Sequence, residues 1–150
     1  QAVRETLERS FIVRISWVFG VNGNNFIKTM LRLAESRSEV RVVCDQIGSP
    51  TYTADLAPLL CDMIGTEKYG VYHATNEGVC SWAELAQETF RKAGKTVRVE
   101  AIPSTEYPVQ AMRPLNSRLS KRALDAAGFS RLPCWQDALD RFLKELEGNK

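Results

Sequence analysis

The feature that most restricts the fold of this sequence is a regular alternation of short apolar runs with amphipathic segments. The apolar runs are rich in β-branched and aromatic residues, as expected of buried strands, and cover residues 11–19, 40–44 and 70–75. A segment with helical spacing of apolar residues follows each run, at residues 26–34, 56–64 and 82–90. Strands that alternate with helices form parallel β-α units. The sequence therefore predicts an α/β fold with a parallel sheet.

Capping residues indicate where these helices begin and end. Ser81 and Glu84 have the spacing of a capping box, and Gly94 supplies a C-terminal stop. Thr53 is predicted to cap the helix over residues 56–64, provided that Pro58 lies close to its start, because a proline deep in a helix removes a hydrogen bond.

The rest of the chain is less regular. Residues 1–9 are predicted to be the tail of a helix. Residues 97–102, in which apolar and polar residues alternate, are predicted to form a strand outside the main sheet with one face exposed to solvent. Residues 103–118 contain three prolines without periodicity, which indicates an extended segment or a long loop, and such loops are often functional. Two helices are predicted to follow, one closed by Gly128 and an amphipathic one after Pro133 that docks on its own chain.

The composition excludes several classes of protein. The 150 residues suit one domain, and the net charge of +2 comes from scattered basic residues, so nucleic acid is not an expected partner. No apolar run approaches the ~20 residues of a membrane span, and the N-terminus lacks the layout of a signal peptide, so we expect a cytoplasmic protein without a membrane partner. Four cysteines without a C-x-x-C pair, with a single histidine, predict buried free thiols and no metal site. His73 is expected to be structural.

Four places in the sequence are candidates for binding. The polar loop within VCDQIGSPTYTADLA follows a strand, so it is either a connector or the rim of a ligand crevice. Trp17 is either a core residue or a platform for a sugar or base, and Arg113 either a surface arginine or a clamp for a diphosphate. GVNGNN has too few glycines for a dinucleotide fingerprint but could hold an anion at the start of a helix.

Five segments together resemble one family. They are, in chain order, RISWVFG, NNFIKTMLRLA, VVCDQIGSPTYTADLA, YHATNEGVCSWAELA and EYPVQAMRPLNSRLSK. In this order they are similar to the C-terminal half of the dTDP-4-dehydrorhamnose reductase family, which belongs to the extended short-chain dehydrogenase/reductases. The resemblance implies a Rossmann-type domain that binds NADPH and a smaller substrate-binding subdomain. It also implies reduction of the C4 ketone of dTDP-4-dehydro-6-deoxy-L-mannose to give dTDP-L-rhamnose.

The same resemblance implies roles for individual residues. Trp17 would contact the sugar or thymine, Asn25 and Arg113 would approach the diphosphate, and Gln46 would support the crevice. The backbone around Ser16 and Val18 would border the nicotinamide. No catalytic or metal-binding residue is expected in this chain, because the family's Tyr-x-x-x-Lys pair and glycine-rich cofactor loop lie upstream of the matched part.

We therefore expect residues 1–150 to be a single fragment, in which the end of a dinucleotide-binding domain is interleaved with a substrate-binding subdomain. Its expected partners are a dTDP-sugar and an N-terminal half, without which it would be inactive, and a homo-oligomer stays open. Two alternatives remain: a non-catalytic regulatory subunit of the same fold, like the β subunit of methionine adenosyltransferase, and an interaction or swapped module. Removal of neighbouring strands would uncover apolar surface, so self-association is predicted.

Overall fold

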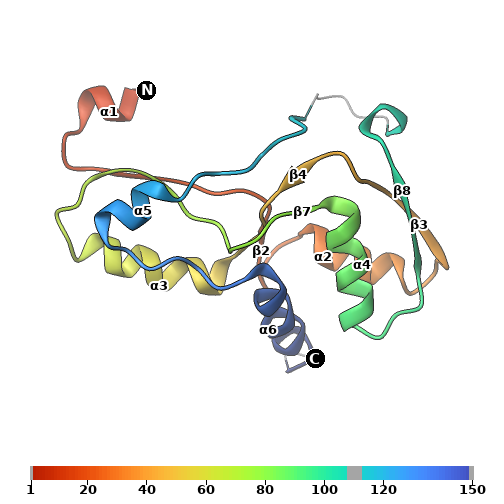
Figure 1. The fold of residues 1–150 in the computed structure, drawn as a ribbon. Coiled ribbons are helices and arrows are strands. Elements are labelled where there is room, and N and C mark those ends of the chain that lie inside the picture. Colours follow the sequence, from red (N-terminus) through yellow and green to blue (C-terminus); the bar gives the residue numbers. More distant parts are fainter. Residues whose placement is uncertain (1, 108–112, 149–150) are drawn as a thin grey trace.

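The computed structural model describes residues 2–107 and 113–148, in which helices and strands alternate (Figure 1). The first elements are α1 (Ala2–Thr6), β1 (Phe11–Arg14), β2 (Val18–Phe19), α2 (Phe26–Leu33), β3 (Glu39–Val43), β4 (Ile47–Gly48), β5 (Thr51–Tyr52) and α3 (Thr53–Ile64). They are followed by β6 (Gly70–His73), β7 (Cys80–Ser81), α4 (Trp82–Lys92), β8 (Arg98–Ile102), the 3-10 helix η1 (Ser104–Glu106), α5 (Arg122–Ala127) and α6 (Trp135–Gly148).

The elements form two lobes on either side of the molecule in Figure 1. The first lobe contains α1, β1, β6, α3 and α5, and the second contains α2, β3, β4, β7, α4 and β8. Parallel pairing joins β1 to β6, from Phe11 opposite Gly70 to Arg14 opposite His73, and β3 to β8. The only antiparallel pair of strands among the described residues is β4 with β7. The predicted α/β class with parallel strands is confirmed, and β8 pairs outside the β1–β6 sheet as expected.

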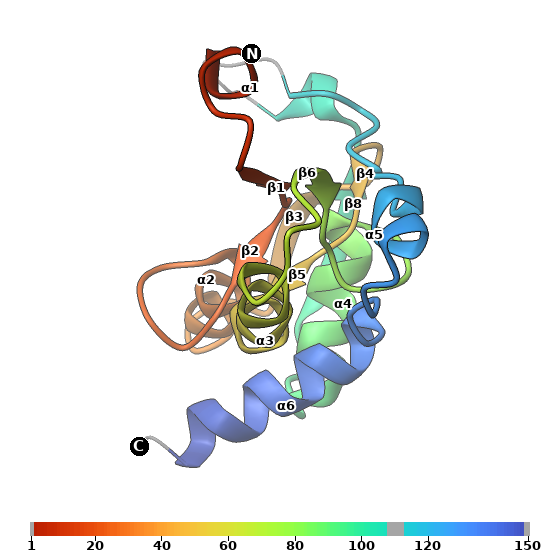
Figure 2. The same ribbon diagram turned by 90° about the vertical axis from the view of Figure 1, so that its left-hand side faces the viewer.

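Each lobe has its own apolar core. In the first lobe, α3 packs its buried face on β6 and α5, through Leu56, Leu59, Met63, Tyr72 and Leu124. In the second lobe, α2 and α4 cover β3, through Met30, Val40, Val42, Ala86 and Phe90. Figure 2 shows α6 running below both lobes, beside α3 and α4. The lobes therefore share a helix.

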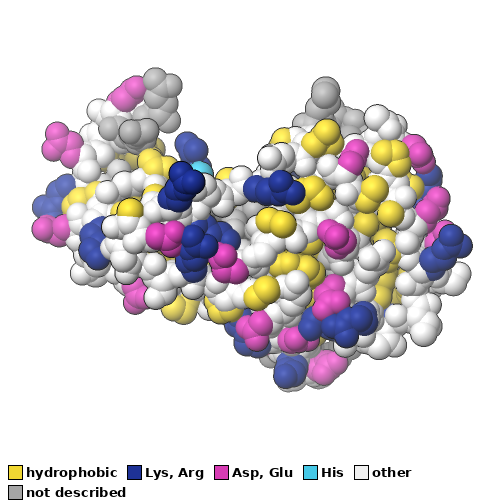
Figure 3. Space-filling model, viewed as in Figure 1, with side chains coloured by type: hydrophobic (Ala, Val, Ile, Leu, Met, Phe, Trp, Pro, Cys, Tyr) yellow, Lys and Arg dark blue, Asp and Glu magenta, His cyan; other side chains and the backbone are white. Residues whose placement is uncertain are grey.

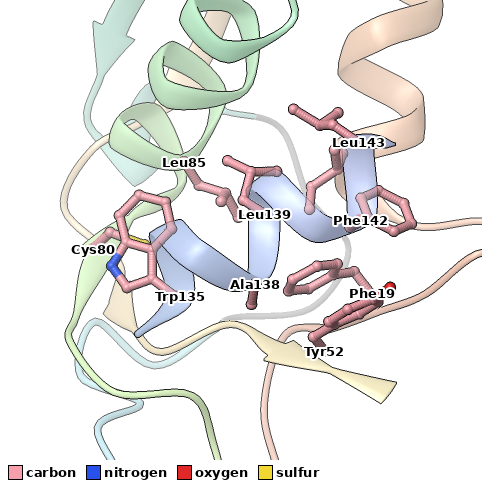
Figure 4. Packing of buried hydrophobic residues seen from close by; sticks show 10 residues of the cluster. Phe19, Tyr52, Cys80, Leu85, Trp135, Ala138, Leu139, Phe142 and Leu143 are labelled. Carbon is pink, nitrogen blue, oxygen red and sulfur yellow. The ribbon is translucent and has the colours of Figure 1, made fainter. Parts of the chain in front are cut away.

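The helix α6 fills a third core between the lobes. Its Leu139 lies against Leu85 of α4, and its Phe142 meets the rings of Phe19 and Tyr52 edge-on (Figure 4). The rings of Phe19 and Tyr52 are stacked with their centroids 5.1 Å apart. Burial of one such aromatic side chain stabilises a fold by about 1.5–3 kcal/mol. The expectation that the C-terminal helix docks on its own chain is borne out.

The predicted continuous strand over residues 11–19 is wrong. The chain leaves β1 at Arg14, and Trp17 adopts a left-handed backbone conformation with φ of 48° before β2 begins. Such a conformation is rare for a residue with a side chain. It redirects the chain, so that β1 pairs with β6 whereas β2 pairs with β5. The apolar run therefore contributes one strand to each of two different parallel pairs.

The predicted ends of the helices are partly correct. The Ser81–Glu84 capping box is present, and Gly94 and Gly128 have left-handed backbones just after α4 and α5. However, Tyr52 occupies the N-cap of α3, because its backbone N–H donates to Asn76 Oδ1, and Thr53 is the first helical residue.

Two further expectations about single residues are wrong. Pro58 lies inside α3, where the hydrogen bond that it cannot donate would have gone to the exposed residue 54. The cysteines are not all buried: Cys80 is, but Cys61 on α3 and Cys134 just before α6 are exposed, and Cys44 after β3 is half-buried.

Candidate ligand-binding site

The polar loop of residues 44–52 lies where the two lobes meet. Its short strand β4 has a neighbour on each side: β7 on one, and the segment around Asn116 on the other. The backbone N–H of Ile47 donates to Leu115 O, and the N–H of Ser117 donates to Ile47 O, both at 2.8 Å. The segment that follows Arg113 is therefore held beside Gln46, although some 70 residues separate them in the sequence.

Gln46 and Asp45 fix the beginning of the proline-rich segment. Gln46 is buried, and its Nε2 donates to Ser104 Oγ at 3.0 Å. The carboxylate of Asp45 accepts hydrogen bonds from the backbone N–H and the hydroxyl of Ser104. These bonds hold the pKa of Asp45 below its usual value. Ser104 was not identified from the sequence, because a serine after a proline carries no signal of such a contact.

Ser16 and Val18 lie just beyond the carboxyl end of β1, the edge of a parallel sheet where ligands bind. Ser16 is tied to the polar loop, because its hydroxyl donates to Ser49 O at 2.8 Å and its carbonyl accepts from Thr51 Oγ1 at 2.6 Å. Val18 pairs with Thr51 and keeps 44% of its surface exposed. The backbone at this point is held by these hydrogen bonds, and its contact with a nicotinamide stays a prediction.

Trp17 is half-buried in an aromatic cluster. Its ring stacks on Trp82 with centroids 3.7 Å apart and an interplanar angle of 16°, and Phe26 lies 4.8 Å from Trp82. A Cβ atom on Gly48 would lie 2.8 Å from the indole of Trp17, so only glycine fits there. Because Trp82 covers one face of the indole, any stacking on a sugar or base has to use another part of the ring. Contact with the sugar stays a prediction.

Asn25 acts as the N-cap of α2. Its Oδ1 accepts from the backbone N–H of Lys28 at 3.0 Å, and its Nδ2 donates to Gly20 O at 2.9 Å. These bonds use one of its two N–H groups and one lone pair of the oxygen. These hydrogen bonds link Asn25 to its own loop and helix and not to the polar loop. Its approach to a diphosphate stays a prediction.

Arg113 is exposed and lies three residues before the bridge at Asn116. Residues 108–112, in the middle of the expected proline-rich segment, lie outside the described residues. Figure 3 shows that the surface is hollowed between the lobes, with basic side chains on both sides of the hollow. An exposed guanidinium suits an anion such as a diphosphate, and the approach of Arg113 to a diphosphate stays a prediction.

The described residues contain only part of what a dinucleotide would need. GVNGNN forms the loop before α2. Within the described part of the chain, the buried hydroxyl of Thr75 has no hydrogen-bond partner, and it lies just beyond the carboxyl end of β6. A ligand at this edge could satisfy it. The same residues contain no group of three or more His, Cys, Asp or Glu that could hold a metal ion.

A second hollow lies away from the predicted binding residues. A hollow of about 640 Å³ opens between β6 and α5, but its lining of Lys68, Tyr72 and small residues includes none of the predicted binding residues. Among the helices that the structure describes, none is long and apolar enough to span a bilayer.

The fold is that of an α/β protein, a class in which ligands bind beyond the carboxyl ends of the parallel strands. Comparison with protein families is more specific: the model described as "RmlD substrate binding domain" matches residues 1–147. The chain belongs to this family, which confirms the resemblance noted in the sequence.

Curated relatives are about twice as long as this chain. It is 43% identical over 145 residues to the spore coat polysaccharide biosynthesis protein SpsK of Bacillus subtilis, covering 97% of this chain and 50% of that protein. It is 39% identical over 157 residues to the dTDP-4-dehydrorhamnose reductase of Escherichia coli K12, covering 97% and 52%. The chain thus spans about half the length of the relatives it matches.

Solved structures agree with the described fold. The dTDP-4-dehydrorhamnose reductase of Bacillus anthracis, crystallised with NADP, matches with a TM-score of 0.90 and 45% identity, over 95% of this chain and 50% of that one. The orthologue from Clostridium acetobutylicum matches with a TM-score of 0.93 and 36% identity, over 97% and 51%. A Thermus thermophilus UDP-glucose 4-epimerase, 16% identical with a TM-score of 0.73, shares the fold.

Proposed function

We propose that this chain is the substrate-binding half of an NADPH-dependent reductase that converts dTDP-4-dehydro-6-deoxy-L-mannose to dTDP-L-rhamnose. The observation that carries the proposal is the match of the substrate-binding family model to residues 1–147. The names of relatives at 36–43% identity support the substrate and the reaction. The segment after Arg113 is hydrogen-bonded to β4, next to Gln46, which supports a substrate site formed by these parts of the chain.

The chain's own residues would bind and orient the sugar nucleotide. Arg113 would clamp the diphosphate through its planar fork of N–H donors, a pairing typical of arginine with phosphate. Trp17 would border the sugar or thymine, and Gln46 would keep the crevice in shape through Ser104.

The nicotinamide would lie against the backbone of Ser16 and Val18, where bound NADPH supplies the hydride for the C4 ketone. The glycine-rich cofactor loop and the proton-donating tyrosine of the family would come from an N-terminal half. The first lobe, with β1 and β6, would then be the end of the dinucleotide-binding domain, and the second lobe the substrate-binding subdomain. The chain alone would bind substrate without reducing it.

Titration calorimetry of this chain with dTDP tests the proposal. Hydrogen bonds to a charged group contribute about 1.5–3 kcal/mol each, so Arg113→Ala should weaken binding by about tenfold or more. Arg37→Ala is the control, because Arg37 is an exposed arginine just after α2, outside the site. Equal affinity of Arg113→Ala and the unsubstituted chain, or no binding by a folded chain, would contradict a preformed diphosphate site in this half.

A further inference from the structure

We propose that Lys121 is a positioning residue for the diphosphate site, because it anchors the far end of the segment that carries Arg113. The inference rests on the proposed function for the identity of the ligand, but the anchor itself is a property of the fold. Figure 1 shows the segment crossing from the second lobe, beside β4, to α5 in the first lobe. Its position therefore depends on attachments at both ends.

The attachment at the β4 end is small. It consists of an isolated parallel bridge between Ile47 and Asn116, with one hydrogen bond to Leu115 O and one from the N–H of Ser117. Leu115 and Asn116 are exposed. Each hydrogen bond contributes about 0.5–1.5 kcal/mol, which is little to hold an exposed segment against its conformational entropy. A second attachment is needed to keep the segment in place.

Lys121 supplies this second attachment. Its side chain is only 8% exposed, and its Nζ donates to Asn76 O at 2.9 Å and to Glu77 Oε1 at 2.8 Å. Lysine is seldom this buried unless its charge is paired. One residue earlier, Ser120 O lies 3.0 Å from Nδ1 of His73 at the end of β6. The end of the segment is therefore fixed to the residues that follow β6.

The group that receives Lys121 is itself rigid. Asn76 is fully buried, and its side chain accepts from the backbone N–H of Tyr52 at 2.8 Å. It also donates to Asp55 Oδ2 at 2.7 Å and to Pro133 O at 2.9 Å. Asp55 is in turn held by two hydrogen bonds from Arg141 of α6. Lys121 thus connects the segment to α3 and α6 through a chain of hydrogen bonds.

Loss of this anchor should loosen the segment while leaving the lobes folded. Lys121→Met keeps the aliphatic stem and removes the ammonium group. The control is Leu124→Val, which makes a small cavity three residues later in the core of the first lobe without touching the anchor. Leu124→Val loses packing near the same place but keeps the hydrogen bonds of Lys121. An effect seen only in Lys121→Met is therefore due to loss of those hydrogen bonds.

Hydrogen exchange at single amides measures whether Lys121 holds the segment in place. In Lys121→Met, protection of the Ile47 and Ser117 amides should fall by about tenfold relative to the unsubstituted chain, with the α4 amides unchanged. In Leu124→Val, the Ile47 and Ser117 amides should keep their protection. Unchanged protection in Lys121→Met, or an equal loss in both variants, would overturn the inference.

Titration calorimetry with dTDP measures whether Lys121 affects binding through Arg113. Lys121→Met should weaken binding by about fivefold to tenfold, and this effect should disappear when Arg113→Ala is already present, since residues that act together give non-additive effects. Additive effects would show that Lys121 does not act through Arg113, and would overturn the positioning role. If the unsubstituted chain does not bind dTDP, the proposed function fails, whereas the exchange experiment still decides the anchor.

Discussion

Asn76 joins parts of the chain that lie far apart in the sequence. Its side chain bonds to Tyr52 N–H before α3, to Asp55 in the first turn of α3 and to Pro133 O before α6, while its carbonyl accepts from Lys121. A buried polar group that lost these partners would carry a penalty of about 1–3 kcal/mol for each unmade hydrogen bond. The network therefore specifies one arrangement of the segments around the end of β6.

Cys80 differs from the other cysteines in the acidity of its thiol. Burial, with a smaller effect of the Glu84 charge, raises the pKa of Cys80 to about 12. Because the thiolate is the reactive form, we expect iodoacetamide at about pH 8.5 to spare Cys80 and to modify the exposed Cys61. Peptide mass spectrometry measures both residues in one sample. Equal modification of the two in the folded chain would contradict this.

The same shift makes stability depend on pH. The folded chain keeps the Cys80 proton above the ordinary thiol pKa of 9.0, whereas the unfolded chain releases it. The stabilisation from this group is therefore complete below pH 9 and is lost as the pH rises toward 12. Cys80→Ala should show a shallower decline of the free energy of unfolding over this range in urea titrations.

At the scale of elements, the predictable parts were those with a local cause. The Ser81–Glu84 box fixes the start of α4 through bonds within four residues, so the sequence reveals it. The break between β1 and β2 could not be predicted, because it arises from pairing with β6 and β5, which are distant in the sequence. Likewise, the cap of α3 depends on Asn76, which lies 24 residues from Tyr52.

The unpaired edge of strand β1 leads us to expect self-association of the chain. Among the described residues, β1 pairs only with β6, and apolar side chains near it are exposed, including Leu7 (56%) and Ile15 (39%). An unpaired edge readily accepts another strand. We expect light scattering to find oligomers of this chain, and a monodisperse monomer would contradict this. Ile15→Lys should reduce association, whereas Ile64→Lys on the far end of α3 should not.

At the scale of the whole molecule, the sequence predicted the fold class and family, whereas the ligand contacts of the expected site residues stay predictions. The structure ties Ser16 and Val18 to the polar loop, and Gln46 of that loop to Ser104. The stacking of Trp17 on Trp82 and the anchor at Lys121 could not be predicted, because both join segments more than 40 residues apart. Their physical basis is tertiary packing, which leaves no periodic pattern.

We propose that this chain supplies the substrate-binding half of a dTDP-4-dehydrorhamnose reductase. The most direct test joins this chain to the half of the Bacillus anthracis reductase that it does not match; the matched half of that protein is 45% identical to this chain. NADPH oxidation is then followed by absorbance with dTDP-4-dehydro-6-deoxy-L-mannose as substrate. We expect turnover that requires this sugar nucleotide, and a raised KM in Arg113→Ala. A folded chimera that binds NADPH but does not oxidise it with this substrate would contradict the proposed function.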